Sequence, residues 1–263
     1  MPVEECIHGL EPGLCDICTP RVVEEPVRST PSRTAKPSIA RTSLRTPPPD
    51  RSGARVAAAP PPVRIDRGTQ RLFHVTHVDN LPGIIADGLV PGAEPAVDLS
   101  SPVTRELRRE TEVAGLPVSA TVAFHVSPEA SRWVELRSGA EGATWSDAAR
   151  ATASADLVVL VSTIAAVSAG VEATVLTDGD AAGTTTRFAV GEEAQTTMLR
   201  RLRFEEDGLL GAEFLVPAVV PFAAIAVIGL ANEPAKERLR ALLPSGRTPK
   251  VSVYPPWFQP AED

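Results

Sequence analysis

Aromatic residues are scarce in this chain, which has one Tyr, three Trp and seven Phe among its 263 residues. This excludes a core built on aromatic packing. Val, Leu, Ile and Ala must fill the core instead, and hydrophobic residues at 43% are numerous enough to do so. No stretch approaches the roughly 18 apolar residues of a membrane-spanning helix, and no signal peptide opens the chain. We therefore expect a cytoplasmic protein without a membrane segment.

A net positive charge is found in only one segment of the chain. The net charge is −7, yet residues 21–64 hold nine Lys and Arg against three acidic residues. Residues 65–263 carry a net charge of −9 by the same count. An acidic body argues against generic nucleic-acid binding, which depends on a positively charged surface. The basic segment could supply electrostatic attraction, although without sequence specificity.

Cysteine is absent from residue 19 onward, which excludes a disulfide framework for most of the chain. The three cysteines and a histidine near the start follow the pattern Cys6-x-His8-x6-Cys15-x2-Cys18. Three thiolates and an imidazole form a ligand set that zinc binds tetrahedrally, and Cys-x2-Cys lets two sulfurs reach one ion. We expect one structural zinc here. The alternative is a flexible terminus with reactive thiols.

The composition divides the chain into three parts. We expect a zinc knuckle over residues 1–20, a disordered Pro/Arg-rich basic linker over residues 21–66, and a folded domain over residues 67–263. The linker contains the runs Pro47–Pro49 and Pro60–Pro62 and lacks apolar periodicity. Burial there could not offset the entropy of ordering the chain.

The third part alternates short strands with helices but has no regular βαβ rhythm, which predicts an α+β fold. Helices are expected after the caps Asp79 or Asn80, around residues 106–109, and over residues 130–139 and 233–243. The expected strands are short and apolar: Leu72–Val75, Ser119–Val126, Leu157–Ser162, Val175–Thr177, Phe214–Val216, Ala224–Ile228 and Val251–Tyr254.

Two of these strands carry isolated polar groups. His74 and Thr76 lie on the first strand, and Glu213 is the one acid beside the apolar strand Phe214–Val216. Taken singly, each has an ordinary structural explanation. An imidazole and a hydroxyl can satisfy each other, a strand glutamate usually faces solvent, and the pair Arg108 and Arg109 is typical of a solvated helix face.

Their combination and order resemble the DarT family of bacterial toxins, which ADP-ribosylate bases of single-stranded DNA. The resemblance covers about residues 70–259 and is most specific at its opening and at the strand that contains Glu213. The segments that carry it are residues 73–89, 103–109, 177–188, 212–222 and 254–258.

The resemblance implies an ADP-ribosyltransferase (PARP-like) fold with a split central β-sheet and flanking helices. It also implies that NAD is the donor substrate, with Glu213 and Arg108 as catalytic residues and Arg109 as the fallback for the arginine. Residues expected to contact the cofactor are His74, Thr76, Asn80, Asp178 and Arg187. Residues expected to contact nucleic acid are Phe124, Trp133 and Trp257.

The chemistry suits these residue types. Transfer from NAD breaks the nicotinamide glycosidic bond through an oxocarbenium-like state, which a nearby carboxylate stabilises. The same carboxylate can accept a proton from the attacking base. Partial burial of Glu213 is expected to raise its pKa toward the range of a general base.

The acceptor is less well specified than the donor. Many DarT sequences carry an Arg-Ser-Pro-Met-Leu motif where this chain has residues 126–130 without the arginine. The leading hypothesis is transfer to single-stranded DNA by a monomer, with a possible macrodomain antitoxin as partner. A second keeps the NAD chemistry but moves the acceptor to RNA, protein or a small molecule. A third makes the chain a non-catalytic zinc-knuckle interaction protein.

Overall fold

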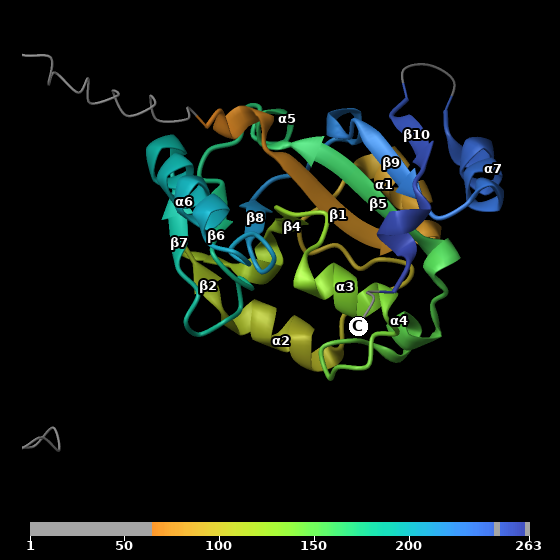
Figure 1. Ribbon diagram of the computed structural model, residues 1–263, viewed down its shortest axis with the longest axis horizontal. Coiled ribbons are helices and arrows are strands. Elements are labelled where there is room, and N and C mark those ends of the chain that lie inside the picture. The colour runs from red at the N-terminus through yellow and green to blue at the C-terminus, as the bar shows by residue number, and fades with distance from the viewer. Residues whose placement is uncertain (1–64, 245–247, 261–263) are drawn as a thin grey trace, which may run out of the picture. The chain divides into compact units, whose positions relative to one another are not determined.

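The computed structural model of the chain describes residues 65–244 and 248–260 (Figure 1). The expected zinc ligands Cys6, His8, Cys15 and Cys18, and nearly all of the expected linker, lie outside these residues. The described region contains helices and strands in mixed order, so the α+β prediction is confirmed. None of the helices in this part of the chain is long and apolar enough to cross a bilayer.

Eight strands form one mixed sheet in the order β10-β9-β5-β1-β4-β8-β6-β7, and β2 and β3 form a separate hairpin. All neighbouring pairs are antiparallel except β9 and β10. The strands are β1 (Arg71–His77), β2 (Glu112–Val113), β3 (Leu116–Pro117), β4 (Val122–His125), β5 (Leu157–Thr163), β6 (Val175–Thr177), β7 (Phe188–Val190), β8 (Glu213–Val216), β9 (Val227–Leu230) and β10 (Lys250–Val253).

Helices cover the sheet and close its two ends. Figure 1 shows α6 beside β6 and β7 at one end and α7 beside β10 at the other, and contacts between these elements agree. The helices are α1 (Leu81–Asp87), α2 (Pro102–Glu110), α3 (Ser131–Arg137), α4 (Asp147–Ala151), α5 (Ile164–Val167), α6 (Glu192–Phe204) and α7 (Glu233–Leu242).

The expected split of the sheet takes a particular form. The strands are hydrogen-bonded into one sheet, but β1 and β4 share a single residue pair, Phe73 with His125. By contrast, β1 pairs with β5 through seven residues and β4 pairs with β8 through four. The sheet therefore consists of two well-paired halves, β10-β9-β5-β1 and β4-β8-β6-β7, that meet at a narrow seam.

The central strand β5 shows why the core lies on both faces of the sheet. Six of its residues, from Leu157 to Ser162, are buried. Side chains alternate between faces along a strand. Accordingly Val158 and Leu160 pack in a cluster with residues of α1, α5, α6 and α7, whereas Leu157, Val159 and Val161 pack in a second cluster with α3 and α4. A continuous apolar run of this kind is what a strand buried on both faces requires.

Several elements differ from the sequence-based expectation, and β9 and α6 show the physical reasons. β9 spans Val227–Leu230 rather than residues 224–228, because Phe222–Ala224 forms a 3₁₀ turn in which the Ala224 N–H donates to the Pro221 carbonyl at 2.8 Å. Helix α6 is long but lacks a clear apolar stripe, since its buried face begins with Gln195 and continues with Leu199 and Leu202. The Gln195 amide donates to the Thr174 carbonyl at 2.7 Å, so a polar side chain occupies a core position without an unsatisfied donor.

Candidate active site

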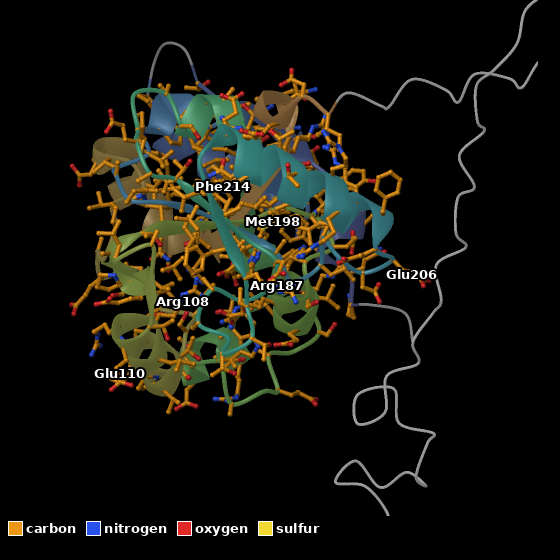
Figure 2. All side chains as sticks on the ribbon, turned by 90° about the vertical axis from the view of Figure 1, so that its left-hand side faces the viewer. Arg108, Glu110, Arg187, Met198, Glu206 and Phe214 are labelled. Atoms are coloured by element: carbon orange, nitrogen blue, oxygen red, sulfur yellow. The ribbon has the colours of Figure 1, made fainter. Side chains whose placement is uncertain are left out.

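Glu213 begins strand β8 and is 2% exposed. Its backbone is fixed by Thr177 of β6, whose hydroxyl accepts from the Glu213 N–H at 3.1 Å and contacts the Glu213 carbonyl at 3.2 Å. The flanking residues Ala212 and Phe214 are fully buried. Figure 2 labels Phe214, the next residue along the strand. A carboxylate in such surroundings must have strong polar partners to remain charged.

Arg108 of α2 is the principal partner. Its Nη2 donates to Glu213 Oε2 at 2.8 Å and its Nη1 to Oε1 at 3.3 Å, so the guanidinium binds the carboxylate in a bidentate manner. The backbone N–H of Ala181 donates to the same Oε2 at 3.0 Å. Helix α2 is set by Ser101, whose hydroxyl accepts from the Thr104 N–H at its first turn. The structure therefore brings Arg108 and Glu213, the two residues expected to be catalytic, into direct contact.

The electrostatics of Glu213 differ from the sequence-based expectation. Burial alone would raise the pKa of this carboxyl, but the charge and hydrogen bonds of Arg108, together with His125 and the Ala181 N–H, outweigh it. The net result is a pKa below the usual value for glutamate. The prediction of a raised pKa was therefore wrong, and Glu213 is an anion at neutral pH. Burial opposes the charge on Arg108 as well, yet Glu213 and Asp180 hold its pKa above the ordinary value.

Two histidines flank this pair. His125 lies directly opposite Glu213 in the register of β4 and β8, and burial lowers its pKa to about 4 even though Glu213 pulls it upward. His74 of β1 uses Nδ1 in a 3.0 Å contact with the Ala123 carbonyl, and burial lowers its pKa too. Both imidazoles are therefore neutral at pH 7, and each can donate from one ring nitrogen and accept at the other.

The sequence did not single out Asp180 or Arg132, but the structure brings both to the site. Asp180 Oδ1 accepts from Arg108 at 3.2 Å and Oδ2 accepts from Arg132 of α3 at 3.3 Å. Asp180 is also held by the Ala182 N–H, which donates to Oδ1 at 2.9 Å. Arg132, Asp180, Arg108 and Glu213 thus form a chain of alternating charges. The repeated acid in Asp178-Gly-Asp180 was the available signal, although spacing alone does not tell which acid faces inward.

Asp178 has the structural role instead. Its side chain forms an ion pair with Arg201 of α6 and accepts from the backbone N–H of Arg187 at 2.7 Å, which closes the loop between β6 and β7. Arg187 is exposed, and its backbone supplies that contact. The structure therefore places Asp178 and Arg187 at the base of the loop, whereas Ala181 and Asp180 lie at its site-facing end.

Thr76 and Asn80 form a buried pair at the end of β1. The Asn80 amide donates to Thr76 Oγ1 and to the Val97 carbonyl, both at 2.9 Å, and its oxygen accepts from the Val97 N–H at 2.8 Å. These bonds hold the segment between α1 and α2 against β1. In this arrangement, contact with a cofactor through the Asn80 side chain would compete with its hold on Val97.

Arg109, the alternative to Arg108, points elsewhere. Its guanidinium is 57% exposed and forms an ion pair with Glu106 on the same helix. Figure 2 shows Arg108, which in contrast is 16% exposed and contacts the buried carboxylate. Geometry therefore distinguishes two adjacent arginines that the sequence left as alternatives.

A family model decides which family this site belongs to. The model described as "ssDNA thymidine ADP-ribosyltransferase, DarT" matches residues 73–259. The chain belongs to this family. No curated protein matches the chain.

Solved DarT structures share the fold. The Thermus sp. 2.9 DarT in complex with ADP-ribosylated ssDNA is 24% identical with a TM-score of 0.60, over 72% of this chain and 96% of that chain. The same protein in complex with NAD+ gives 24% identity and a TM-score of 0.57, over 72% and 97%. Thermosipho africanus DarTG in complex with ADP-ribose is 19% identical with a TM-score of 0.53, over 72% of this chain and 51% of that chain. The expected ADP-ribosyltransferase fold is thus confirmed.

Two of the three aromatic residues expected to contact nucleic acid occupy core positions in this chain. Phe124 is 1% exposed and Trp133 is 3% exposed, so neither presents a ring face to a base. Trp257 is partly buried, with its ring packed edge-on against Phe73 and Tyr254. Phe124 and Trp133 therefore serve the interior, and Trp257 is the one of the three that keeps partial exposure.

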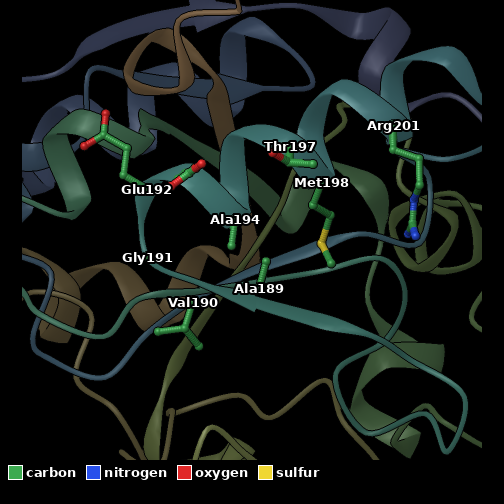
Figure 3. Close-up of a pocket in the computed structure, with 9 residues that line it drawn as sticks. Ala189, Val190, Gly191, Glu192, Ala194, Thr197, Met198 and Arg201 are labelled. Atoms are coloured by element: carbon green, nitrogen blue, oxygen red, sulfur yellow. The ribbon is translucent and has the colours of Figure 1, made fainter.

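Two concavities of the described region are lined by residues other than Arg108 and Glu213. A groove of about 640 Å³ runs between β7 and α6, lined by residues from Ala189 to Arg201 (Figure 3). A second, of about 710 Å³, is bordered by Ser101, Arg105, Trp145 and Arg150. Within residues 65–244 and 248–260, no cluster of three or more His, Cys, Asp or Glu could hold a metal ion.

Proposed function

We propose that Glu213 and Arg108 carry the NAD-dependent transfer of ADP-ribose to single-stranded DNA, the activity of the DarT family to which this chain belongs. One observation supports these roles above others. A buried carboxylate at the start of β8 is held by a forked guanidinium and a backbone N–H in a cluster to which β4, β8, α2 and the loop after β6 each contribute. Perturbed ionisable groups concentrated in this way are characteristic of active sites.

The role of Glu213 follows from its charge. Transfer moves the positive charge of the nicotinamide ring onto the ribose as the glycosidic bond breaks, and nicotinamide leaves as a neutral molecule. A fixed anion stabilises that developing charge, and the effect is large where water is excluded. As its nitrogen bonds to the ribose, the acceptor base loses its N–H proton. That N–H becomes acidic in the same step, so even a carboxylate with a lowered pKa can accept the proton.

Arg108 sets the position of that anion. Its bidentate contact fixes both oxygens of Glu213, and its contact with Asp180 fixes the guanidinium in turn. A planar fork suits this task better than a point charge would. We assign His74 and Thr76 of β1, together with Asn80, to the binding of NAD. Asp178 and Arg187 contribute to NAD binding indirectly, through the loop between β6 and β7 that they close.

We propose thymine as the acceptor base, following the description of the family. In a DNA strand thymine has a single N–H, at N3, so the proton that must leave is defined. We expect label from NAD to appear on single-stranded oligonucleotides that contain thymine. Oligonucleotides of equal length with every thymine replaced by cytosine should stay unlabelled. Label on RNA or protein but not on DNA would instead favour the second acceptor hypothesis, and no NAD turnover would favour the non-catalytic one.

The zinc knuckle remains a proposal that rests on its ligand set. Cys6, His8, Cys15 and Cys18 offer three thiolates and one imidazole within 13 residues. The apolar content of this segment is too small to fold unaided, so metal binding would supply its folding free energy. We expect one zinc per chain in metal analysis of the full-length protein, and a Cys15→Ser, Cys18→Ser variant should lose it. A wild-type zinc content well below one would overturn this assignment.

The wider setting is proposed from the family. A macrodomain-type antitoxin is a reasonable partner for a DarT toxin, and one of the similar structures is a DarTG protein. We further propose a cytoplasmic monomer, with residues 1–20 and 21–66 as knuckle and linker ahead of a catalytic domain at 67–263. The target of such an enzyme, single-stranded DNA, lies in that compartment.

A further inference from the structure

Arg132 has more hydrogen-bonding capacity than the structure uses. It lies in the first turn of α3, and its side chain is 19% exposed. Its guanidinium carbon lies 4.8 Å from the centroid of the Trp145 ring, so the aromatic face fixes the side chain. Among the described residues its one hydrogen bond goes to Asp180 at 3.3 Å. A guanidinium has five N–H donors, so several remain for a ligand.

A groove adjoins this residue. Trp145, on whose ring Arg132 lies, also lines the concavity of about 710 Å³. The charged side chains along the groove are paired, Arg105 with Asp98 and Arg150 with Asp147. The rest of the lining is small or neutral and includes Ala96, Val97, Ser100, Pro102 and Ser146. A groove with balanced charge and several hydroxyl groups suits a neutral, partly polar ligand such as a nucleoside.

The net charge of the side chains around Arg132 indicates what kind of anion Arg132 could bind. Arg132, Asp180, Arg108 and Glu213 together are neutral, and Arg108 is committed to Glu213. One guanidinium with free donors in a neutral cluster matches a phosphate of single charge better than a dianionic pyrophosphate. Each linkage of a DNA strand carries one such charge, whereas the two phosphates of NAD carry two.

We propose that Arg132 and the groove beside Trp145 form a subsite for one nucleotide of the acceptor strand next to the modified base. Arg132 binds its phosphodiester, and the groove receives its sugar and base. This inference rests on the proposed function. The rings of Phe124 and Trp133 are buried and cannot stack on bases of the acceptor strand. Arg132 and the groove offer another way to bind that strand. Asp180 acts as a positioning residue, since it holds both Arg132 and Arg108.

The test compares Arg132→Gln with wild type in steady-state transfer from labelled NAD to a thymine-containing oligonucleotide. The KM for the oligonucleotide should rise about tenfold or more, with the KM for NAD changed less than about twofold. The slope of log affinity against log salt concentration should become shallower by about 0.7, the value for one phosphate contact on a single strand. Arg132→Lys should keep most of that slope, because the charge remains. Arg109→Gln is the matched control, since Arg109 is exposed and pairs with Glu106.

The outcomes separate the possible sources of the phosphate. A rise in the KM for NAD, with the KM for DNA unchanged, would assign Arg132 to the donor and overturn the proposal. Unchanged values for both substrates would also overturn it. Thermal unfolding of each variant shows whether a change in KM comes from misfolding. If Arg132→Gln does not fold, Arg132→Lys is compared with wild type instead. If wild type transfers no label to DNA, the proposed function itself fails, which is a different result from an active wild type whose variant behaves identically.

Discussion

Glu213→Gln should abolish ADP-ribose transfer, with a fall in rate of at least about 10²–10³-fold, the range seen when a preorganised electrostatic contact is removed. The substitution keeps the size of the side chain and an oxygen that can accept from Arg108 and Ala181. It removes the negative charge that stabilises the ribose as the glycosidic bond breaks. The measurement is the initial rate of label transfer from NAD to single-stranded DNA, at saturating NAD.

Glu106→Gln provides the matched control for this variant. Glu106 lies on α2, the helix that also carries Arg108, but its side chain is 55% exposed and pairs with Arg109. The same chemical change there should leave the rate within about twofold of wild type, since exposed pairs contribute little. Comparable rates in Glu213→Gln and wild type would remove Glu213 from the mechanism.

Arg108→Gln should have the second largest effect, on both rate and stability. It leaves a buried carboxylate without its main partner, which typically costs about 3 kcal/mol of unfolding free energy. The rate of transfer should fall about 10²-fold or more, because Glu213 loses its fixed orientation and part of its charge. Thermal unfolding and transfer rates report the two effects separately, with Arg109→Gln as the control at the adjacent position.

The stability difference should depend on pH in a defined direction. In wild type the pKa of Glu213 is below its usual value, so its contribution is present above pH 4.5 and is lost as pH falls through the folded-state pKa. Without Arg108, burial dominates and the pKa of Glu213 rises. The carboxylate then costs stability at pH 7, and protonation relieves that cost as the pH falls. The gap in unfolding free energy between wild type and Arg108→Gln should therefore narrow from pH 7 to pH 5.

A double variant provides an independent test of the ion pair between Arg108 and Glu213. When Glu213→Gln is added to Arg108→Gln, no buried carboxylate is left without its partner. The double variant should therefore be more stable at pH 7 than Arg108→Gln alone, a coupling that reports direct contact between the two residues. A pH-independent gap, or fully additive losses, would contradict the ion pair as the source of the effect.

Local sequence signals were sufficient for much of the fold. The apolar run of β5 and a helix beginning after Asn80 were predicted, because a strand buried on both faces and a helix start leave local traces. The expected side-chain cap at Asp79 or Asn80 was wrong, since Asn80 makes no cap hydrogen bond and its amide bonds Thr76 and Val97 instead. Helix α6 was not predicted, since its buried face includes Gln195, whose fit depends on Thr174 and Arg67, 21 and 128 residues away. Tertiary hydrogen bonding overrode the apolar pattern at that position.

The candidate site likewise combines features that local sequence indicates with features that depend on distant contacts. The family resemblance selected His74, Arg108 and Glu213 from the sequence, and the structure brings Arg108 and Glu213 into direct contact. The sequence already favoured Arg108 over Arg109, and the contact of Arg108 with Glu213 supports that preference. The inward direction of Asp180 rather than Asp178 required the structure. The pKa of Glu213 required the distances themselves, because burial and an ion pair act in opposite directions and sequence gives neither magnitude.

The narrow seam between β1 and β4 has a consequence for how the site is assembled. One backbone pair, Phe73 with His125, joins the two halves of the sheet, and the His74 imidazole adds a second link to the Ala123 carbonyl. His74 belongs to one half and Glu213 to the other. The placement of His74 relative to Glu213 therefore depends on the few contacts across this seam, to which the Gln70 amide adds a bond to the Val126 carbonyl at 2.9 Å.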